Sequence, residues 1–319
     1  MEAKRFIIFK IFLFITISFF LSCRPHEEGN KDSTGDLTLF HAACFSPVID
    51  AIRTDSERDL SIRLRTEASG SQVVLRKVAE LGRECDLMMI ADSRLFREIA
   101  SSVCTWRLDF AHDEMVLGVG IRAKRVDEAE KDWVAVLLDD DINFGRVDEN
   151  LGPVGYRTLL VWKLKDNNPD LAERLKVKCD KVVDDVSHLA VLLKAGDLEY
   201  GFLYKSTCIN YDIRYIPLEE EINLGSMEVE YSGAEVSFEK LEDGGKEKVK
   251  IKGAPITMSL SIPSNALNRN GAIIFIRYIL DNHVGQFKKH GFTFFRPGFY
   301  GEEKDYTMLK DYADYSGRF

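Results

Sequence analysis

The spacing of hydrophobic and polar positions changes repeatedly along the chain, which predicts strands and helices in alternation. Runs typical of strands, either alternating or continuously apolar, lie at 37–40, 61–66, 86–91, 115–121, 142–146, 199–204 and 256–262. Helical patterns lie between and after these runs, starting near residues 46, 71, 133, 153, 186 and 271. Strands that alternate with helices in this way are typical of an α/β fold, and we expect one from residue 36 onward.

The expected helix starts carry small or hydroxyl residues that suit a helix N-terminus. Ser46 is expected to cap the first helix, and the turn Gly152-Pro153-Val154-Gly155 opens a later one. Ser71 is expected to cap a helix whose apolar face is formed by Val74, Val78 and Leu81 and which ends at Gly82.

Between residues 228 and 252 the pattern changes to that of a β-hairpin, with Asp243-Gly244-Gly245 as its turn. The order of elements fits two α/β lobes between which the chain crosses. We expect lobe 1 to comprise 36–116 and, with the C-terminal tail, 250–319, and lobe 2 to comprise 117–249.

The N-terminus has the pattern of a targeting signal. Lys4 and Arg5 precede an apolar stretch over residues 6–20, which is shorter than the about 20 apolar residues that a membrane-spanning helix needs. The stretch ends at Phe20-Leu21-Ser22-Cys23, which resembles a bacterial lipobox. We therefore expect residues 1–22 to be a lipoprotein signal peptide and Cys23 to be lipidated, with an uncleaved membrane anchor as the alternative. Residues 23–35 are expected to form a tether that holds the folded part on the periplasmic or extracellular face of the cell membrane.

The composition is that of a globular protein, with 45% hydrophobic and 30% charged residues among 319. The formal net charge is −9, and loss of residues 1–22 would remove three basic residues and one acidic residue, leaving −11. So acidic a chain is not expected to bind nucleic acid. The five cysteines after Cys23 cannot all pair and form no CxxC motif, so we expect at least one free thiol and no metal site.

The sequence contains no motif typical of a hydrolase, a P-loop protein, a dinucleotide-binding protein or a zinc protease, so neither a cofactor nor catalysis is expected. His41 and Cys44 stand three residues apart, which leaves a Cys–His nucleophile as an alternative to a structural histidine. The expected helix N-termini offer different chemistry, because their unpaired N–H groups and partial positive charge attract anions. If they converge, an anion site without a cation forms at Ser46, Ser71, Gly155 and Val186.

Several motifs, taken in order, resemble the molybdate/tungstate-binding proteins of ABC transporters, and in particular their tungstate-binding branch. These motifs are His41-Ala42-Ala43-Cys44, Glu67-Ala68-Ser69-Gly70-Ser71, Arg76–Gly82, Asp86–Asp92, Gly152–Arg157 and Leu192–Lys205. The resemblance runs from about Leu37 to Gly298. It implies the two-lobed periplasmic binding protein fold of type II, with a hinge between the lobes, and capture of a tetrahedral oxyanion by neutral hydrogen-bond donors.

The same resemblance implies which residues bind the oxyanion, namely Cys44, Ser71, Val154, Val186 and Tyr204. Cys44 stands where the family has a serine, and a thiol is a weaker donor. Gly152 and Val186 stand where the tungstate branch has a coordinating aspartate and glutamate, which implies a four-coordinate anion held by hydrogen bonds alone. Arg157, beside the turn, is expected to form an ion pair on the helix surface.

The resemblance further implies a monomeric substrate-binding lipoprotein that delivers molybdate or tungstate to the permease subunit of an ABC transporter. Two alternatives stay open. The same fold could bind sulfate, phosphate or another oxyanion, or a surface lipoprotein could have kept the fold without a role in transport. An enzyme would have to rely on His41 and Cys44.

Overall fold

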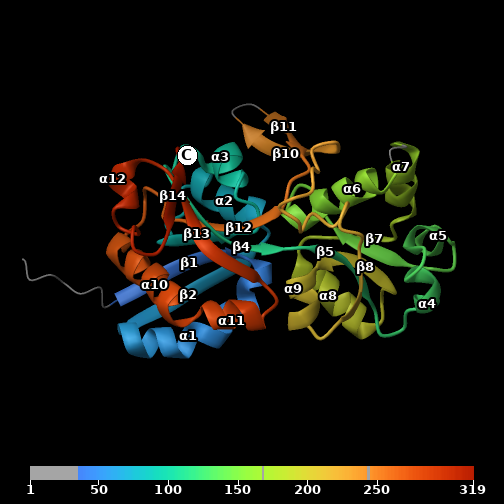
Figure 1. The fold of residues 1–319 in the computed structure, drawn as a ribbon, viewed down its shortest axis with the longest axis horizontal. Coiled ribbons are helices and arrows are strands. Elements are labelled where there is room, and N and C mark those ends of the chain that lie inside the picture. Colours follow the sequence, from blue (N-terminus) through green and yellow to red (C-terminus); the bar gives the residue numbers. More distant parts are fainter. Residues whose placement is uncertain (1–34, 167–168, 243–244) are drawn as a thin grey trace, which may run out of the picture. The chain divides into compact units, whose positions relative to one another are not determined.

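The computed structural model describes residues 35–166, 169–242 and 245–319, which form two β-sheets with helices packed on them and a separate hairpin (Figure 1). The predicted signal peptide, Cys23 and the tether as far as residue 34 lie outside the described residues. Within the described ranges, no helix is long and apolar enough to cross a membrane.

The larger sheet has seven strands of mixed direction. Their order is β14 (Asp314–Gly317), β13 (Thr293–Tyr300), β4 (Arg107–Asp113), β12 (Ile256–Ser261), β3 (Leu87–Ile90), β1 (Gly35–Ala42) and β2 (Ile62–Ser69). All four residues of β3 are buried, as its apolar run predicts. Its neighbour β1 pairs with β3 in the parallel direction, whereas β12, a strand from late in the chain, pairs with β3 in the antiparallel direction. The sheet is therefore parallel on one side of β3 and antiparallel on the other.

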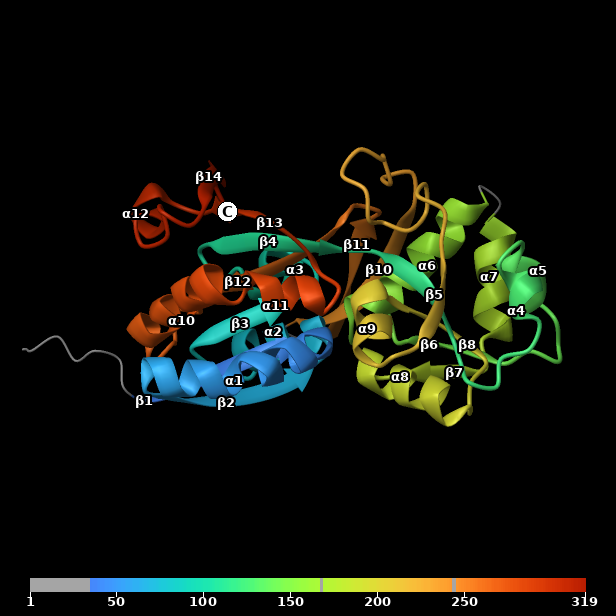
Figure 2. The same cartoon turned by 60° about the horizontal axis from the view of Figure 1, so that its bottom comes forward.

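Helices cover both faces of this sheet. The connections from β1 to β2 and from β2 to β3 run through α1 (Ser46–Leu60) and α2 (Ser71–Ala79). Both connections join parallel strands, but the chain moves across the sheet in one direction in the first and in the opposite direction in the second. Right-handed crossovers therefore place the two helices on opposite faces (Figure 1). Beside α2 lies α3 (Leu95–Ala100), and near α1 lie α10 (Arg269–Asn282) and α11 (Val284–Lys289) (Figure 2).

The smaller sheet has five strands, in the order β7 (Lys181–Val183), β6 (Phe144–Val147), β8 (Tyr200–Tyr204), β5 (Met115–Val119) and β9 (Arg214–Pro217). Its helices are α6 (Pro153–Lys165) and α7 (Pro169–Lys178) on one side and α8 (Val186–Ala195) and α9 (Lys205–Asn210) on the other (Figure 1). Three short helices complete the described elements, namely α4 (Val126–Ala129), α5 (Trp133–Leu137) and α12 (Glu303–Tyr306).

We call the seven-stranded sheet with its helices lobe 1 and the five-stranded sheet with its helices lobe 2. The chain leaves lobe 1 where β4 ends at Asp113, enters lobe 2 where β5 begins at Met115, and returns to lobe 1 in β12. The predicted α/β class with two lobes is confirmed. The residue boundaries expected for the lobes stay a prediction.

The predicted hairpin is present and contacts a helix of each lobe. It consists of β10 (Glu235–Glu242) and β11 (Gly245–Lys252), so it begins later than residue 228, and most of its expected turn lies outside the described residues. Phe238 stacks on Tyr156 of α6, with 5.6 Å between ring centroids. Arg76 of α2 donates a hydrogen bond to the carbonyl oxygen of Glu239.

Two predicted helix caps are wrong by one residue. A 3₁₀ turn, η1 (Ala43–Phe45), leads into α1, so Phe45 is the cap residue and Ser46 is already helical. Gly70 caps α2, and Ser71 is its first residue. The apolar face of α2 also ends earlier than expected, because the helix stops at Ala79 and Leu81 is 71% exposed.

Candidate anion-binding site

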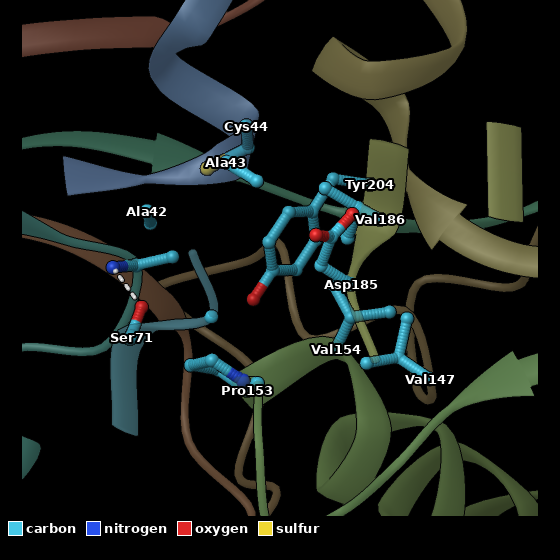
Figure 3. Close-up of a pocket in the computed structure, with 13 residues that line it drawn as sticks. Ala42, Ala43, Cys44, Ser71, Val147, Pro153, Val154, Asp185, Val186 and Tyr204 are labelled. Carbon is cyan, nitrogen blue, oxygen red and sulfur yellow. Dashed lines mark hydrogen bonds between the residues drawn. The ribbon is translucent and has the colours of Figure 1, made fainter. Parts of the chain in front are cut away.

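One cavity lies where strands of both lobes end and helices begin (Figure 3). It is lined by Ala42, Ala43, Cys44, Gly70, Ser71, Ala91, Val147, Gly152, Pro153, Val154, Asp185, Val186 and Tyr204. The space open to the centre of a water molecule is about 20 Å³, a little more than a single water needs. A cavity of this size suits a small ion and is too small for a sugar or a peptide.

All five positions implied by the resemblance line this one cavity. Three of them come from lobe 2, namely Val154 at the start of α6, Val186 at the start of α8 and Tyr204 at the end of β8. Lobe 1 supplies Cys44 in η1 and Ser71 at the start of α2. The structure brings these residues together, and their role as ligands stays a prediction.

The starts of three long helices meet at the cavity. The first N–H groups of a helix have no partner within it and carry partial positive charge, so α2, α6 and α8 direct donors to this region. Proline has no N–H, and Val154 therefore supplies the first donor of α6. Two expected contributors, Ser46 and Gly155, do not line the cavity. Ser46 follows η1, and Gly155 packs so closely that a Cβ there would lie 2.3 Å from the Asp148 carbonyl oxygen.

Asp185 brings a carboxylate to the cavity wall, which the sequence analysis missed. Its Oδ1 caps α8 by accepting hydrogen bonds from the N–H groups of Ser187 at 2.8 Å and His188 at 3.0 Å. Neither bond involves the N–H of Val186, which is the first of the helix. An aspartate directly before a helical pattern is a usual cap signal and could have indicated this role.

The two hydroxyl groups of the cavity each accept a hydrogen bond from the protein. The backbone N–H of Ala91 donates to Ser71 Oγ at 3.0 Å, and the guanidinium of Arg157 donates to the Tyr204 hydroxyl. Figure 3 shows the Tyr204 ring reaching from β8 into the cavity and, as a dashed line, the hydrogen bond that Ser71 accepts. Both side chains are buried, so their positions are set by packing as well as by these bonds.

Arg157 is wholly buried, and the expectation of a surface ion pair is wrong. Its Nη1 donates to the Ala91 carbonyl oxygen at 2.5 Å, and its Nη2 lies 3.0 Å from Asp92 Oδ2. Every residue of α6 from Pro153 to Trp162 is buried. A helix buried all round has no polar face, so the helical periodicity could not show where this arginine points.

Asp92 is the counter-ion that keeps Arg157 charged inside the protein. It also pairs with Arg94 at 2.6 Å and accepts a hydrogen bond from the Tyr156 hydroxyl at 2.6 Å. Burial alone would raise the pKa of the Asp92 carboxyl, but the charges of Arg94 and Arg157 outweigh it and hold that pKa well below its usual value. Since Asp92 follows β3 in lobe 1 and Arg157 lies on α6 in lobe 2, this pair joins the lobes beside the cavity.

Cys44 and His41 do not form a nucleophilic pair. Burial raises the pKa of the Cys44 thiol far above its ordinary value, so no thiolate forms near neutral pH. His41 is buried too, and its Nδ1 lies 3.0 Å from the Ala42 carbonyl oxygen. The five cysteines of the described residues are all free thiols, which agrees with the expectation that at least one would stay unpaired.

The fold and the cavity together define a two-lobed solute-binding protein of the type II periplasmic class. The chain belongs to the bacterial extracellular solute-binding protein family, which matches residues 37–293. This is a family of solute-binding proteins and not of enzymes. The family resemblance inferred from the sequence motifs is thereby confirmed.

Relatives share most of this chain. An uncharacterized solute-binding protein of Petrotoga mobilis is 34% identical over 258 residues, which cover 78% of this chain and 80% of that protein. The molybdate/tungstate-binding protein WtpA of Pyrococcus abyssi is 28% identical over 288 residues, covering 80% and 82% of the two chains.

Solved structures support the fold. The periplasmic molybdate-binding protein of Azotobacter vinelandii superposes with a TM-score of 0.58 at 14% identity, covering 81% of this chain and 98% of that one. The sulfate-binding protein SubI of Mycobacterium tuberculosis gives a TM-score of 0.55 at 12% identity, covering 89% and 94%. At such identities the likeness shows a shared fold only.

Proposed function

We propose that this protein captures a tetrahedral oxyanion, molybdate or tungstate, in the cavity between its lobes and delivers it to the permease of an ABC transporter. The observation that carries the proposal is the meeting of three helix starts and two buried hydroxyls at one ion-sized cavity. WtpA, a relative along most of the chain, is named as a molybdate/tungstate-binding protein, which supports this choice of anion.

The donors of the cavity suit an anion without a positive side chain in its wall. Backbone N–H and hydroxyl groups at Ser71, Val154, Val186 and Tyr204 are neutral, but a hydrogen bond to an ion is roughly twice as strong as one between neutral groups. Helix dipoles add to the attraction. A protein with a net charge of −9 can therefore bind an anion, because the local field of the donors outweighs the distant surface charges, which salt screens.

The wall also bears on how the anion is held. Glycine at 152 and valine at 186 leave no carboxylate at these two positions. The carboxylate that is present, Asp185, has its Oδ1 engaged by two N–H groups of α8. We infer a four-coordinate anion held by hydrogen bonds, with the size of the cavity separating molybdate and tungstate from the smaller sulfate.

Thermal unfolding with molybdate, tungstate, sulfate or phosphate tests this proposal. A ligand at 100 times its dissociation constant adds about 2.7 kcal/mol to the free energy of unfolding, so molybdate or tungstate should raise the melting temperature. Tyr204→Phe and Ser71→Ala should each weaken binding about tenfold, the loss of one hydrogen bond to an ion. Tyr200→Phe is the matched control, because its hydroxyl bonds the Lys124 carbonyl oxygen and does not line the cavity.

The outcomes separate the alternatives. A shift with sulfate or phosphate in place of molybdate would change the ligand and keep the class of receptor. A folded protein that binds none of the four anions would contradict the proposal and favour a surface lipoprotein without a transport role. Full affinity in both cavity variants would place binding elsewhere.

The proposal includes a lipid anchor at Cys23 and a monomeric receptor held near its permease. The basic and apolar N-terminus and the sequence Phe20-Leu21-Ser22-Cys23 support the anchor. Replacing Cys23 by alanine should move the protein from the membrane fraction to a soluble fraction in fractionated cells. An unchanged distribution would refute lipidation as the means of attachment.

A further inference from the structure

The hairpin of β10 and β11 lies in the segment by which the chain returns from lobe 2 to lobe 1, and it forms a small sheet of its own. Figure 1 shows it between α2 of lobe 1 and α6 of lobe 2. The buried apolar side chains of the hairpin are Val236, Phe238, Val249 and Ile251. Because a lone two-stranded hairpin is at best marginally stable in water, its packing against the lobes holds it in place.

Lobe 2 provides the first anchor of the hairpin. Phe238 is 1% exposed and stacks on the Tyr156 ring of α6, with 5.6 Å between the ring centroids. The backbone N–H of Glu239 donates a hydrogen bond to Asn150 Oδ1 at 2.7 Å. Asn150 lies in the loop that precedes α6, so both contacts fix β10 to the same part of lobe 2.

Lobe 1 provides the second anchor through Arg76 on α2. Its guanidinium donates to the carbonyl oxygen of Glu239 in the hairpin and to that of Asn150, the latter at 3.1 Å. One charged side chain of lobe 1 therefore binds the hairpin and a loop of lobe 2 at the point where these two bind each other. The Arg76 side chain is only 16% exposed, and hydrogen bonds from a charged donor are stronger than those between neutral groups.

The helix α2 connects this second anchor to the cavity. It begins with Ser71 in the cavity wall. One turn before Arg76, and on the same face of the helix, Gln72 Nε2 donates to the Glu149 carbonyl oxygen at 2.9 Å. The contact between α2 and lobe 2 thus starts at the cavity and ends under the hairpin.

We propose that the hairpin is a clasp that stays on lobe 2, is held to lobe 1 by Arg76 when the lobes are closed, and slows the release of the bound solute. The inference rests on the proposed function for the identity of the solute. The cavity donors act on the ligand itself, whereas the clasp acts on the closed conformation, whichever anion is bound. An interaction made only in the closed form shifts the equilibrium toward that form, so its loss should speed release and leave the rate of capture unchanged.

A chase experiment on the full chain tests the clasp. Release of radioactively labelled molybdate into excess unlabelled molybdate is followed for the wild type, Arg76→Met, Phe238→Ala and the double variant. Methionine fills space but donates no hydrogen bond, so Arg76→Met should release molybdate about tenfold faster, with an unchanged association rate. Phe238→Ala should speed release by a smaller factor, because Arg76 still binds the Asn150 carbonyl oxygen.

The double variant distinguishes a clasp from two unrelated contacts. A hairpin that lobe 1 no longer holds cannot oppose opening, so the double variant should release molybdate no faster than Arg76→Met alone. The matched control is Arg53→Met, because Arg53 donates to the Leu64 carbonyl oxygen at 2.6 Å within lobe 1. It should stay within about twofold of the wild type. Multiplied effects in the double variant, unchanged release in Arg76→Met, or equal acceleration in Arg53→Met would overturn the inference.

Small-angle X-ray scattering without ligand separates failure of the clasp from failure of the proposed function. A wild type that binds neither molybdate nor tungstate would refute the proposed function, and the scattering would then decide on the clasp. Arg76→Met should have a larger radius of gyration than the wild type and Arg53→Met, because its lobes are open for more of the time. Equal radii in the three proteins would overturn the inference.

Discussion

The ion pair between Asp92 and Arg157 is expected to be a main support of the native state. Asp92 is 1% exposed, and Arg157 is 0% exposed. Replacing Asp92 by asparagine removes the counter-charge and leaves a guanidinium buried with only neutral partners. Removing one partner of a buried pair costs about 3–5 kcal/mol, because an uncompensated charge stays in the interior. We expect Asp92→Asn to lower the free energy of unfolding by about this amount at pH 7.

Urea unfolding followed by fluorescence and circular dichroism measures this change, and agreement of the two probes checks that a single free energy applies to the two lobes. Asp36→Asn is the control, because Asp36 pairs with Arg63 on the exposed side of lobe 1. Exposed pairs contribute about 0–1 kcal/mol. A loss for Asp92→Asn as small as that for Asp36→Asn would refute the reasoning and mean that Arg157 is compensated by its carbonyl and hydroxyl partners alone.

The pH dependence of the same difference has a definite sign. The pKa of Asp92 is lower in the folded protein than in the unfolded chain, so its contribution is fully present above the unfolded value of about 3.9 and is lost as the pH falls below it. The gap between wild type and Asp92→Asn should therefore be constant from pH 6 to 8 and shrink below about pH 4.

Two further predictions concern the contact between the lobes and the crossing strand. At Gly70 an added Cβ would lie 2.0 Å from the Leu151 carbonyl oxygen, so Gly70→Ala should hold the lobes apart and weaken oxyanion binding more than tenfold in calorimetry. The control is Gly285→Ala, which adds a Cβ in open space and should leave the affinity unchanged. Equal affinities of the two variants would contradict the close contact between the lobes at Gly70. Burial raises the pKa of Asp113 to about 7, so its charge costs stability as the pH rises from about 4 to 7, and Asp113→Asn should be more stable than the wild type by up to about 4 kcal/mol at pH 8. That gain should vanish near pH 4 in thermal unfolding, and a gain independent of pH would show that Asp113 does not titrate in this range.

The alternation of strands and helices was predictable because most elements bury one regular set of apolar positions. The run 86–91 and the helical pattern that starts near residue 186 both correspond to elements of the fold. The placement of β12 between β3 and β4 was not predictable, because no local pattern shows which strands from distant parts of the chain will pair.

Of the candidate site, only residues that line the cavity could be predicted, and not the charged pair behind them. The family resemblance led to all five cavity positions, but the periodicity of the chain could not show that they converge. Arg157 and Asp92 were missed as a pair, because their positions are 65 residues apart in the sequence and α6 has no polar face that would reveal a buried charge. The helix caps predicted at Ser46 and Ser71 were wrong by one residue. The conformation of the preceding backbone decides where a helix begins, and the sequence pattern does not show that conformation.

Anomalous diffraction from crystals grown with tungstate would show directly whether the cavity binds the oxyanion, because tungsten can be located without assumptions about the protein. We expect one strong tungsten peak between Ser71 and Tyr204, at the starts of α2, α6 and α8, with four oxygen atoms around the metal. A cavity without tungsten, or a tungsten ion bound only at another place on the protein, would contradict it.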